Sequence, residues 1–319
     1  MQTQLAHLIK NQMFEGYLLV KGGEQRTSSN GSKFLDMTLA DISAEVNAKM
    51  WDGNTPAPKC GQVVKVRAMM LEYNGRPQLR VDKLRPLEER DQVDMSLLVP
   101  CAPYPPEDML KALTDRVAKM KDEGLRQVVT KRLEMAGDAI LYFPAAQKLH
   151  HAEKGGLLHH TSTMLRLAEA VCAVYPTLDS DLLAAGVILH DLCKMSEMNS
   201  DEMGVVTDYT VEGMLLGHLV EGVSEIQAIC DEVGVDEELK LMLSHMILSH
   251  HDLPEFGSPK PPMFPEAEIL HEIDLMDARM YEMNYALRSA QPGGFTERIW
   301  SLERRLYRRK ETPVKDNQE

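Results

Sequence analysis

The chain has 319 residues, of which 44% are hydrophobic and 26% are charged, proportions that are ordinary for a folded soluble protein. No apolar run approaches the roughly 20 residues that a membrane-spanning helix requires, and the N-terminal MQTQLAHLIKNQ lacks the basic flank and apolar stretch of a secretory signal. The net charge of −14 argues by itself against a polyanionic substrate, and five scattered cysteines without a CxxC pair argue against disulfides or a thiolate zinc site. We therefore expect a cytoplasmic protein with no membrane partner and with reduced, mostly buried thiols.

The first 86 residues have the pattern of short strands separated by turn-forming residues. Strands are expected at 14–21, 33–40, 42–51, 63–71 and 78–84. The segment GGEQRTSSNGS at 22–32 predicts a long loop, and Asn74-Gly75 predicts a tight hairpin between the last two strands. Five strands with these turns favour an all-β OB-fold barrel over residues 1–86.

Charge divides the sequence at the same place. Residues 1–86 carry a net charge of +4, whereas the remaining 233 residues carry a net charge of −18. This division suits a mildly basic binding module joined to an acidic domain that binds a metal.

A linker and then a helical domain are expected after the barrel. Residues 87–106 show no clear hydrophobic period and contain four prolines, at positions 100, 103, 105 and 106, which predicts a linker. Apolar residues at three- and four-residue spacing, clearest at 163–175 and 182–192, predict an all-α helical bundle over 107–310. The tail at 311–319 is expected to be frayed.

Ten of the eleven histidines lie between positions 150 and 271. Imidazoles and carboxylates are ligand types that suit a borderline or hard divalent metal, and an adjacent His-Asp pair on a helix can hold one ion or bridge two. Residues spaced by 23–32 positions would come from successive helices and converge inside a bundle. The ordered set that predicts a metal centre is His160, His190, Asp191, His218, His250, His251 and Asp274.

This order of residues resembles the HD superfamily of metal-dependent phosphohydrolases. The surrounding segments are GGLLHHT at 155–161, LHDLCKM at 189–195, YTVEGMLLGHLVEG at 209–222, HMILSHHDLPEFGSPKPP at 245–262 and EILHEIDLMDA at 268–278. Together they resemble the YhaM-type 3′–5′ exoribonucleases, which join an N-terminal OB-fold to an HD domain, and the resemblance covers nearly the whole chain. Cys193 and Asp252 stand at positions where glycine is common in that family.

The resemblance implies how the site would be organised. The residues matching the core metal ligands are His160, His190, Asp191 and Asp274, and those matching the extra histidines of two-metal members are His218, His250 and His251. Asp191 would bridge two divalent ions, with Mn²⁺ favoured over Fe²⁺, Mg²⁺ or Co²⁺, and the ions would activate water for attack on the terminal phosphodiester. Lys194 would be a second catalytic residue that holds the scissile phosphate.

The other histidines of the helical domain are not expected to be metal ligands. His245 and His271 lie one or two turns from proposed ligands, where orienting partners are often found. The non-ligands are expected to be His150, His151 and His159.

Single-stranded nucleic acid would be bound by aromatic platforms and a basic groove. The candidates are Phe34, Trp51, Tyr73, Lys33, Arg67 and Arg76 on the barrel, and Lys260 in the GSPKPP segment of the helical domain. The expected partner is single-stranded RNA, with single-stranded DNA as a second possibility, and the family resemblance implies a homo-oligomer.

Two other functions stay open at this point. The first is hydrolysis of a small nucleotide, such as a cyclic dinucleotide or a nucleoside triphosphate, although FGSP follows the double histidine where the cyclic-dinucleotide branch has GYP. The second is single-strand binding by a protein with an inactive HD domain, against which the filled ligand positions weigh.

Overall fold

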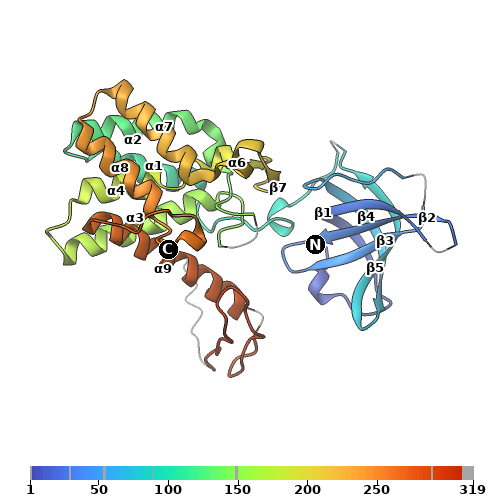
Figure 1. Cartoon of the computed structure of the whole chain (residues 1–319). Coiled ribbons are helices and arrows are strands. Elements are labelled where there is room, and N and C mark those ends of the chain that lie inside the picture. The colour runs from blue at the N-terminus through green and yellow to red at the C-terminus, as the bar shows by residue number, and fades with distance from the viewer. Residues whose placement is uncertain are drawn as a thin grey trace.

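The computed structural model describes residues 2–28, 30–52, 55–88, 90–147, 150–288 and 290–310. A five-stranded barrel is followed by a helical domain, and the two lie side by side (Figure 1). The predicted order, a small all-β barrel before an all-α bundle, is confirmed. The tail at 311–319, predicted to be frayed, lies outside the described residues.

The barrel closes on itself in the order β1-β2-β3-β5-β4. Alternate side chains point inward, so that Leu18, Leu35 and Leu79 are fully buried in its core. Strand β3 pairs with β5 in parallel, and the other pairings are antiparallel. The strands are β1 (Met13–Thr27), β2 (Lys33–Ala40), β3 (Glu45–Met50), β4 (Val63–Tyr73) and β5 (Arg76–Pro86), preceded by the short helix η1 (Leu5–His7).

The hairpin at Asn74-Gly75 is confirmed, whereas the long loop at 22–32 was a wrong prediction. Asn74 and Gly75 have positive φ angles of 50° and 74°, as a tight hairpin turn requires. Strand β1 continues to Thr27, after a shift of register between Val20 and Gly22. The polar residues beyond this bulge are held by the ladder to β2, and bulges of this kind let a long strand curve around a barrel.

The third strand is shorter than the predicted 42–51. It begins at Glu45, because the carboxylate of Asp41 accepts hydrogen bonds from the backbone of Ser43 and Ala44 and so forms a turn.

Nine α-helices build the described part of the second domain. They are α1 (Pro106–Ala118), α2 (Glu123–Ala136), α3 (Gly156–Val174), α4 (Ser180–Leu189), α5 (Lys194–Glu197), α6 (Val211–Leu215), α7 (Gly217–Val233), α8 (Glu237–Ser249) and α9 (Pro265–Leu287). The 3-10 helices are η2 (Met95–Leu97), η3 (Gly137–Leu141) and η4 (Pro254–Phe256), and a small hairpin is formed by β6 (Met198–Ser200) and β7 (Val206–Tyr209).

Helix α4 is the central helix of this domain. Its residues from Leu182 to Leu189 are all buried, and it packs against α3, α8 and α9. The carboxylate of Asp179 caps its first turn. Gly186 leaves room for Met246 of α8, since a Cβ at that position would lie 2.2 Å from the Met246 Cε. The C-terminal end of α4 therefore reaches the middle of the bundle.

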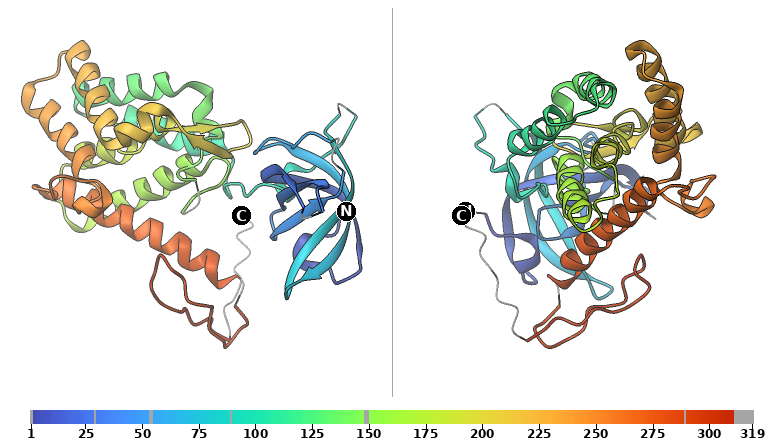
Figure 2. Two further views of the ribbon diagram at one scale, coloured as in Figure 1. Left: turned by 45° about the vertical axis from the view of Figure 1, so that its right-hand side comes forward. Right: turned by 90° about the vertical axis from the view of Figure 1, so that its left-hand side faces the viewer.

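The barrel meets the helical domain through a small apolar cluster. Leu19 and Val63 of the barrel pack with Leu98 and Val99 of the connecting segment and with Val205, which precedes β7. A cavity of about 860 Å³ lies between the two parts, and Figure 2 shows their arrangement from two further directions. Within the described residues, no helix combines the length and apolar character that crossing a membrane demands.

Candidate metal centre

Four imidazole nitrogens converge on one buried carboxylate. The Nε2 atoms of His160 and His190 lie 3.8 Å and 3.4 Å from Asp191 Oδ2, and those of His218 and His250 lie 3.6 Å and 3.7 Å from Asp191 Oδ1. These nitrogens and Oδ1 are buried and have no hydrogen-bond partner among the described residues. Buried polar groups are almost always paired. This set of unpaired nitrogen and oxygen atoms therefore fits a cation held between them.

The opposite nitrogen of each of these four rings is anchored. His190 Nδ1 donates to the Val187 carbonyl and His250 Nδ1 to the Ile247 carbonyl, each at 2.8 Å and one turn back along the chain. His218 Nδ1 lies 3.1 Å from the Glu197 carboxylate, and His160 Nδ1 lies 2.7 Å from a carboxylate of α9. Each anchor turns Nε2 toward Asp191.

His190 and Asp191 lie in a turn rather than in a helix. The apolar helix was predicted to continue to 192, but α4 ends at Leu189 and residues 190–193 form turns that lead into α5. The Lys194 backbone N–H donates to the Asp191 carbonyl, and its Nζ donates to Asp191 Oδ2 at 2.8 Å. The turn thus places Lys194 beside the carboxylate with its side chain almost fully buried.

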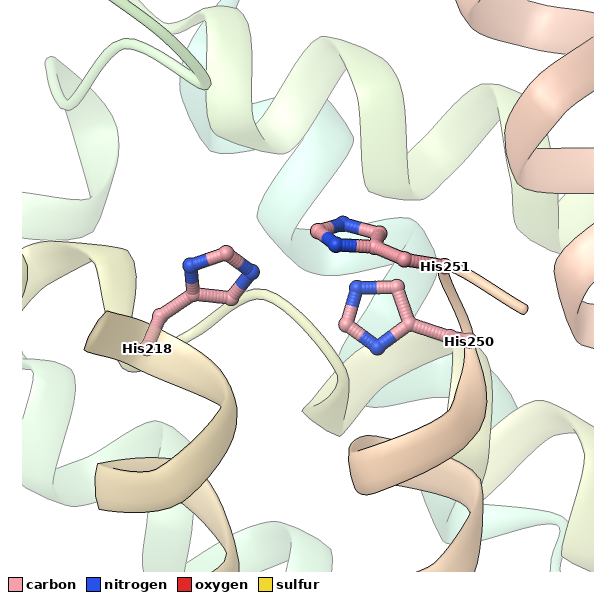
Figure 3. A group of neighbouring side chains, drawn as sticks. All are labelled: His218, His250 and His251. Atoms are coloured by element: carbon pink, nitrogen blue, oxygen red, sulfur yellow. The ribbon is translucent and has the colours of Figure 1, made fainter. Parts of the chain in front are cut away.

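Asp274 and His251 complete the predicted set from two other elements. Asp274 Oδ1 of α9 lies 3.2 Å from His160 Nε2. The His251 ring lies 4.2 Å from that of His250 and 5.3 Å from that of His218, measured between centroids. Figure 3 shows these last three rings turned toward one another, and one ligand atom from each lies within 4.8 Å of the others. All seven predicted ligands therefore meet in one place.

Local charges hold the Asp191 carboxylate ionised, and burial leaves two of the rings neutral. Burial raises the pKa of Asp191, but the charges of Lys194 and His190 outweigh it and hold this pKa well below its usual value. Burial lowers the pKa of His250 to about 4 and that of His251 to about 3. Neutral imidazoles next to an ionised carboxylate are the protonation states that metal binding requires.

His160 differs from the other rings. Burial alone would lower its pKa, but the carboxylates of Asp274 and Asp277 beside the ring raise the pKa to about 10. A proton and a cation therefore compete for its Nε2 lone pair.

Several polar residues around the centre were missed or set aside by sequence reasoning. Glu197, which anchors His218, carries no motif of its own. His150 lies with its ring centroid 5.7 Å from that of His160, and burial, with the charges of Lys194 and His160, lowers its pKa to about 3. His271 Nδ1 donates to the His250 carbonyl, in keeping with an orienting role, whereas His245 Nε2 accepts from the Met263 backbone.

On the barrel, the three aromatic residues predicted to bind nucleic acid lie close to one another and to Lys49, a residue that the sequence analysis did not select. The rings of Phe34 and Trp51 stack with centroids 4.7 Å apart, and Lys49 Nζ lies 5.2 Å from the Phe34 centroid and 5.9 Å from that of Tyr73. Trp51 is 58% and Tyr73 61% exposed, while Phe34 is buried. Lys49 could have been found from the alternation of outward residues in its strand.

The lysines and arginines predicted to bind nucleic acid lie in three separate regions. Lys33 precedes Phe34, and Arg76 pairs with Tyr73 across the hairpin, so both lie near the aromatic group. Arg67 lies in the middle of β4, six residues from Tyr73, which is roughly 20 Å along a strand. Lys260 is exposed in the loop after η4, on the helical domain.

Known proteins similar to this chain were found by sequence and by structure. A family model described as "HD domain" matches residues 157–279. The 3′-5′ exoribonuclease YhaM of Halalkalibacterium halodurans is 41% identical over 297 residues, which cover 92% of each chain. The 3′-5′ exoribonuclease YhaM of Bacillus subtilis is 42% identical over 296 residues, which cover 91% of this chain and 93% of that protein. The second OB-fold domain of replication protein A from Methanococcus maripaludis aligns with 29% of this chain and all of that domain, at 15% identity and a TM-score of 0.24.

The helical fold and its histidine-aspartate donor set define the HD-domain class of phosphohydrolases, which bind divalent metal ions. The chain belongs to the YhaM family of 3′–5′ exoribonucleases, as the sequence resemblance predicted.

Proposed function

We propose that this protein is a metal-dependent 3′–5′ exoribonuclease that degrades single-stranded RNA, with single-stranded DNA as a second substrate. The observation that carries the proposal is the ring of four unpartnered Nε2 atoms around Asp191, in a chain that belongs to this family. The cytoplasmic location and the self-association implied by the resemblance belong to the same proposal.

The two oxygens of Asp191 support a centre for two ions. Oδ2 faces His160 and His190, and Oδ1 faces His218 and His250. One ion would be held on the Oδ2 side with Asp274, and the other on the Oδ1 side with His251. Nitrogen and oxygen donors of this kind suit Mn²⁺, which we favour over Fe²⁺, Mg²⁺ and Co²⁺.

When bound, the ions would supply hydroxide near neutral pH and balance charge on the phosphate. The protein side chains hold the groups that surround this chemistry. Asp191 fixes Lys194 Nζ at 2.8 Å, at the rim of the donor set, where the ammonium would bind a non-bridging oxygen of the scissile phosphate. His150 adds a neutral, mostly buried ring on the His160 side of the same space.

A 5′-labelled single-stranded RNA tests the direction and the class of reaction together. With Mn²⁺ present, the wild-type protein is expected to produce a ladder that shortens from the 3′ end, while a 3′-labelled strand releases labelled mononucleotide from the first time point. Release of internal fragments would indicate an endonuclease. Absence of degradation under several divalent metals, with hydrolysis of mononucleotides instead, would contradict the proposal.

The exposed aromatic pair on the barrel is expected to contribute to binding of the strand. Trp51→Ala and Tyr73→Ala should each weaken binding of a long oligonucleotide by about 1–3 kcal/mol, the usual value of one stacked base. The measurement is the KM for a 30-nucleotide RNA beside the KM for a dinucleotide, which is too short to reach the barrel and the metal centre together. Trp300→Ala, at a residue 91% exposed outside the barrel, is the matched control. Equal KM values for wild type and both barrel variants would remove these residues from the binding surface.

A further inference from the structure

A buried hydrogen-bond network lies behind His160, on the side of the ring that faces away from Asp191. Asp277 Oδ2 lies 2.7 Å from His160 Nδ1 and 2.7 Å from His151 Nε2. Asp277 is 6% exposed, and both rings are at most 1% exposed. None of the proposed catalytic steps uses Asp277 or His151.

Helix α9 places a carboxylate beside each of the two nitrogens of the His160 ring. Asp274 faces Nε2, and Asp277, three residues later on the same face of the helix, accepts from Nδ1. A ring turned by 180° would place carbon atoms where the two nitrogens now lie, and the Asp277 oxygen would then lose the hydrogen bond from His160. One helix therefore sets both the position and the orientation of this ring.

The Asp277 oxygen is itself held in place by further residues. His151 donates to it from Nε2 and turns its Nδ1 toward His159 Nδ1 at 3.1 Å. His159 Nδ1 lies 2.7 Å from Glu153 Oε1, and the Tyr281 hydroxyl donates to Glu153 Oε2 at 2.9 Å. Tyr281 also lines the cavity between the barrel and the helical domain, so the network extends from there to His160.

The donor atoms of His151, Glu153 and His159 also lie within 4.8 Å of one another, a spacing that a metal ion could use. Each of these atoms, however, is hydrogen-bonded to another member of the network. The described Nε2 atoms around Asp191 have no such partners. This contrast assigns the first group to hydrogen bonding and the second to metal binding.

We propose that Asp277 is a positioning residue for the metal centre, because it accepts the Nδ1–H of His160 and so aims Nε2 at the cation shared with Asp191 and Asp274. The inference rests on the metal centre proposed above. It adds a residue that contacts neither the substrate nor the ion and acts only through His160.

The test compares Mn²⁺ affinity, measured by equilibrium dialysis of the full-length protein without any RNA. Asp277→Ala is expected to bind Mn²⁺ about 10–100-fold more weakly, the usual effect of removing a partner of a metal-bound histidine. Asp277→Asn should lose several-fold less affinity than Asp277→Ala, since its amide oxygen can still accept the Nδ1–H. Glu272→Gln, at an exposed position on the same helix, should bind as wild type does.

A second readout separates positioning from general damage to the fold. Excess Mn²⁺ should restore the kcat of Asp277→Ala, and the visible absorption of the Co²⁺-loaded variant should differ from that of wild type because one ligand is displaced. Wild-type affinity and an unchanged Co²⁺ spectrum in Asp277→Ala would overturn the proposal. Where Asp277→Ala fails to fold by circular dichroism, Asp277→Leu, which fills a similar volume but accepts no hydrogen bond, takes its place, and wild-type affinity in that variant would overturn the proposal equally.

The remaining outcomes are also decisive. Glu153→Gln should weaken Mn²⁺ binding slightly without changing the number of ions bound. Loss of a whole ion from Glu153→Gln would make the His151, Glu153 and His159 group a separate cation site and contradict the assignment. Failure of wild type to bind Mn²⁺ would remove the metal centre itself, which is distinguishable from a failure confined to Asp277.

Discussion

Asp191→Asn is expected to lower kcat/KM on single-stranded RNA by at least roughly 10³-fold, the upper end of the effect of removing one electrostatic group from an active site. The substitution keeps the shape of the side chain but removes the charge that four imidazoles and Lys194 face. The measurement is the rate at which a 5′-labelled 30-nucleotide RNA shortens at saturating Mn²⁺. Asp115→Asn, at an exposed aspartate on α1, controls for the substitution itself.

Folding must be separated from catalysis in this experiment. Asp191→Asn leaves the buried ammonium of Lys194 without its charged partner, which alone can destabilise the chain. His190→Gln provides the independent check, because it leaves the Lys194–Asp191 pair intact and should lose activity to a similar extent. Activity within tenfold of wild type in either folded variant would show that the reaction does not depend on this centre.

Mn²⁺ is expected to stabilise the wild-type protein against unfolding. A cation that binds only the folded state at 100 times its Kd adds about 2.7 kcal/mol per site to the free energy of unfolding. For a domain of this size that corresponds to a rise in Tm of roughly 5–10 °C. The rise should be larger at pH 8 than at pH 6, because the ion displaces a proton from His160, whose pKa is raised to about 10.

Two variants test how much each of the two proposed ions contributes to this stabilisation. His190→Gln removes a donor on the Oδ2 side of Asp191, and His218→Gln removes one on the Oδ1 side. Each should retain part of the Mn²⁺-induced rise in Tm measured by differential scanning calorimetry, whereas Asp191→Asn should lose most of it. If His218→Gln behaves as wild type and His190→Gln loses the whole effect, the centre holds a single ion.

The sequence by itself was enough to predict the fold class and the candidate metal ligands that the structure brings together. Histidine and aspartate at spacings of 23–32 residues would come from successive helices and converge inside a bundle. Alternation of apolar residues and the Asn74-Gly75 turn were enough to predict the barrel, since both are local properties of the chain.

The tertiary structure alone decided which groups surround those ligands. The strand at Gly22–Thr27 had a loop composition, and only pairing with β2 made it a strand. Asp277, Glu153 and Glu197 have no motif, because their roles depend on which ring nitrogen they meet after helices far apart in sequence have packed. A metal ligand must be of a particular residue type, so sequence reveals it, whereas its orienting partner can be any acceptor that packing brings within hydrogen-bond distance.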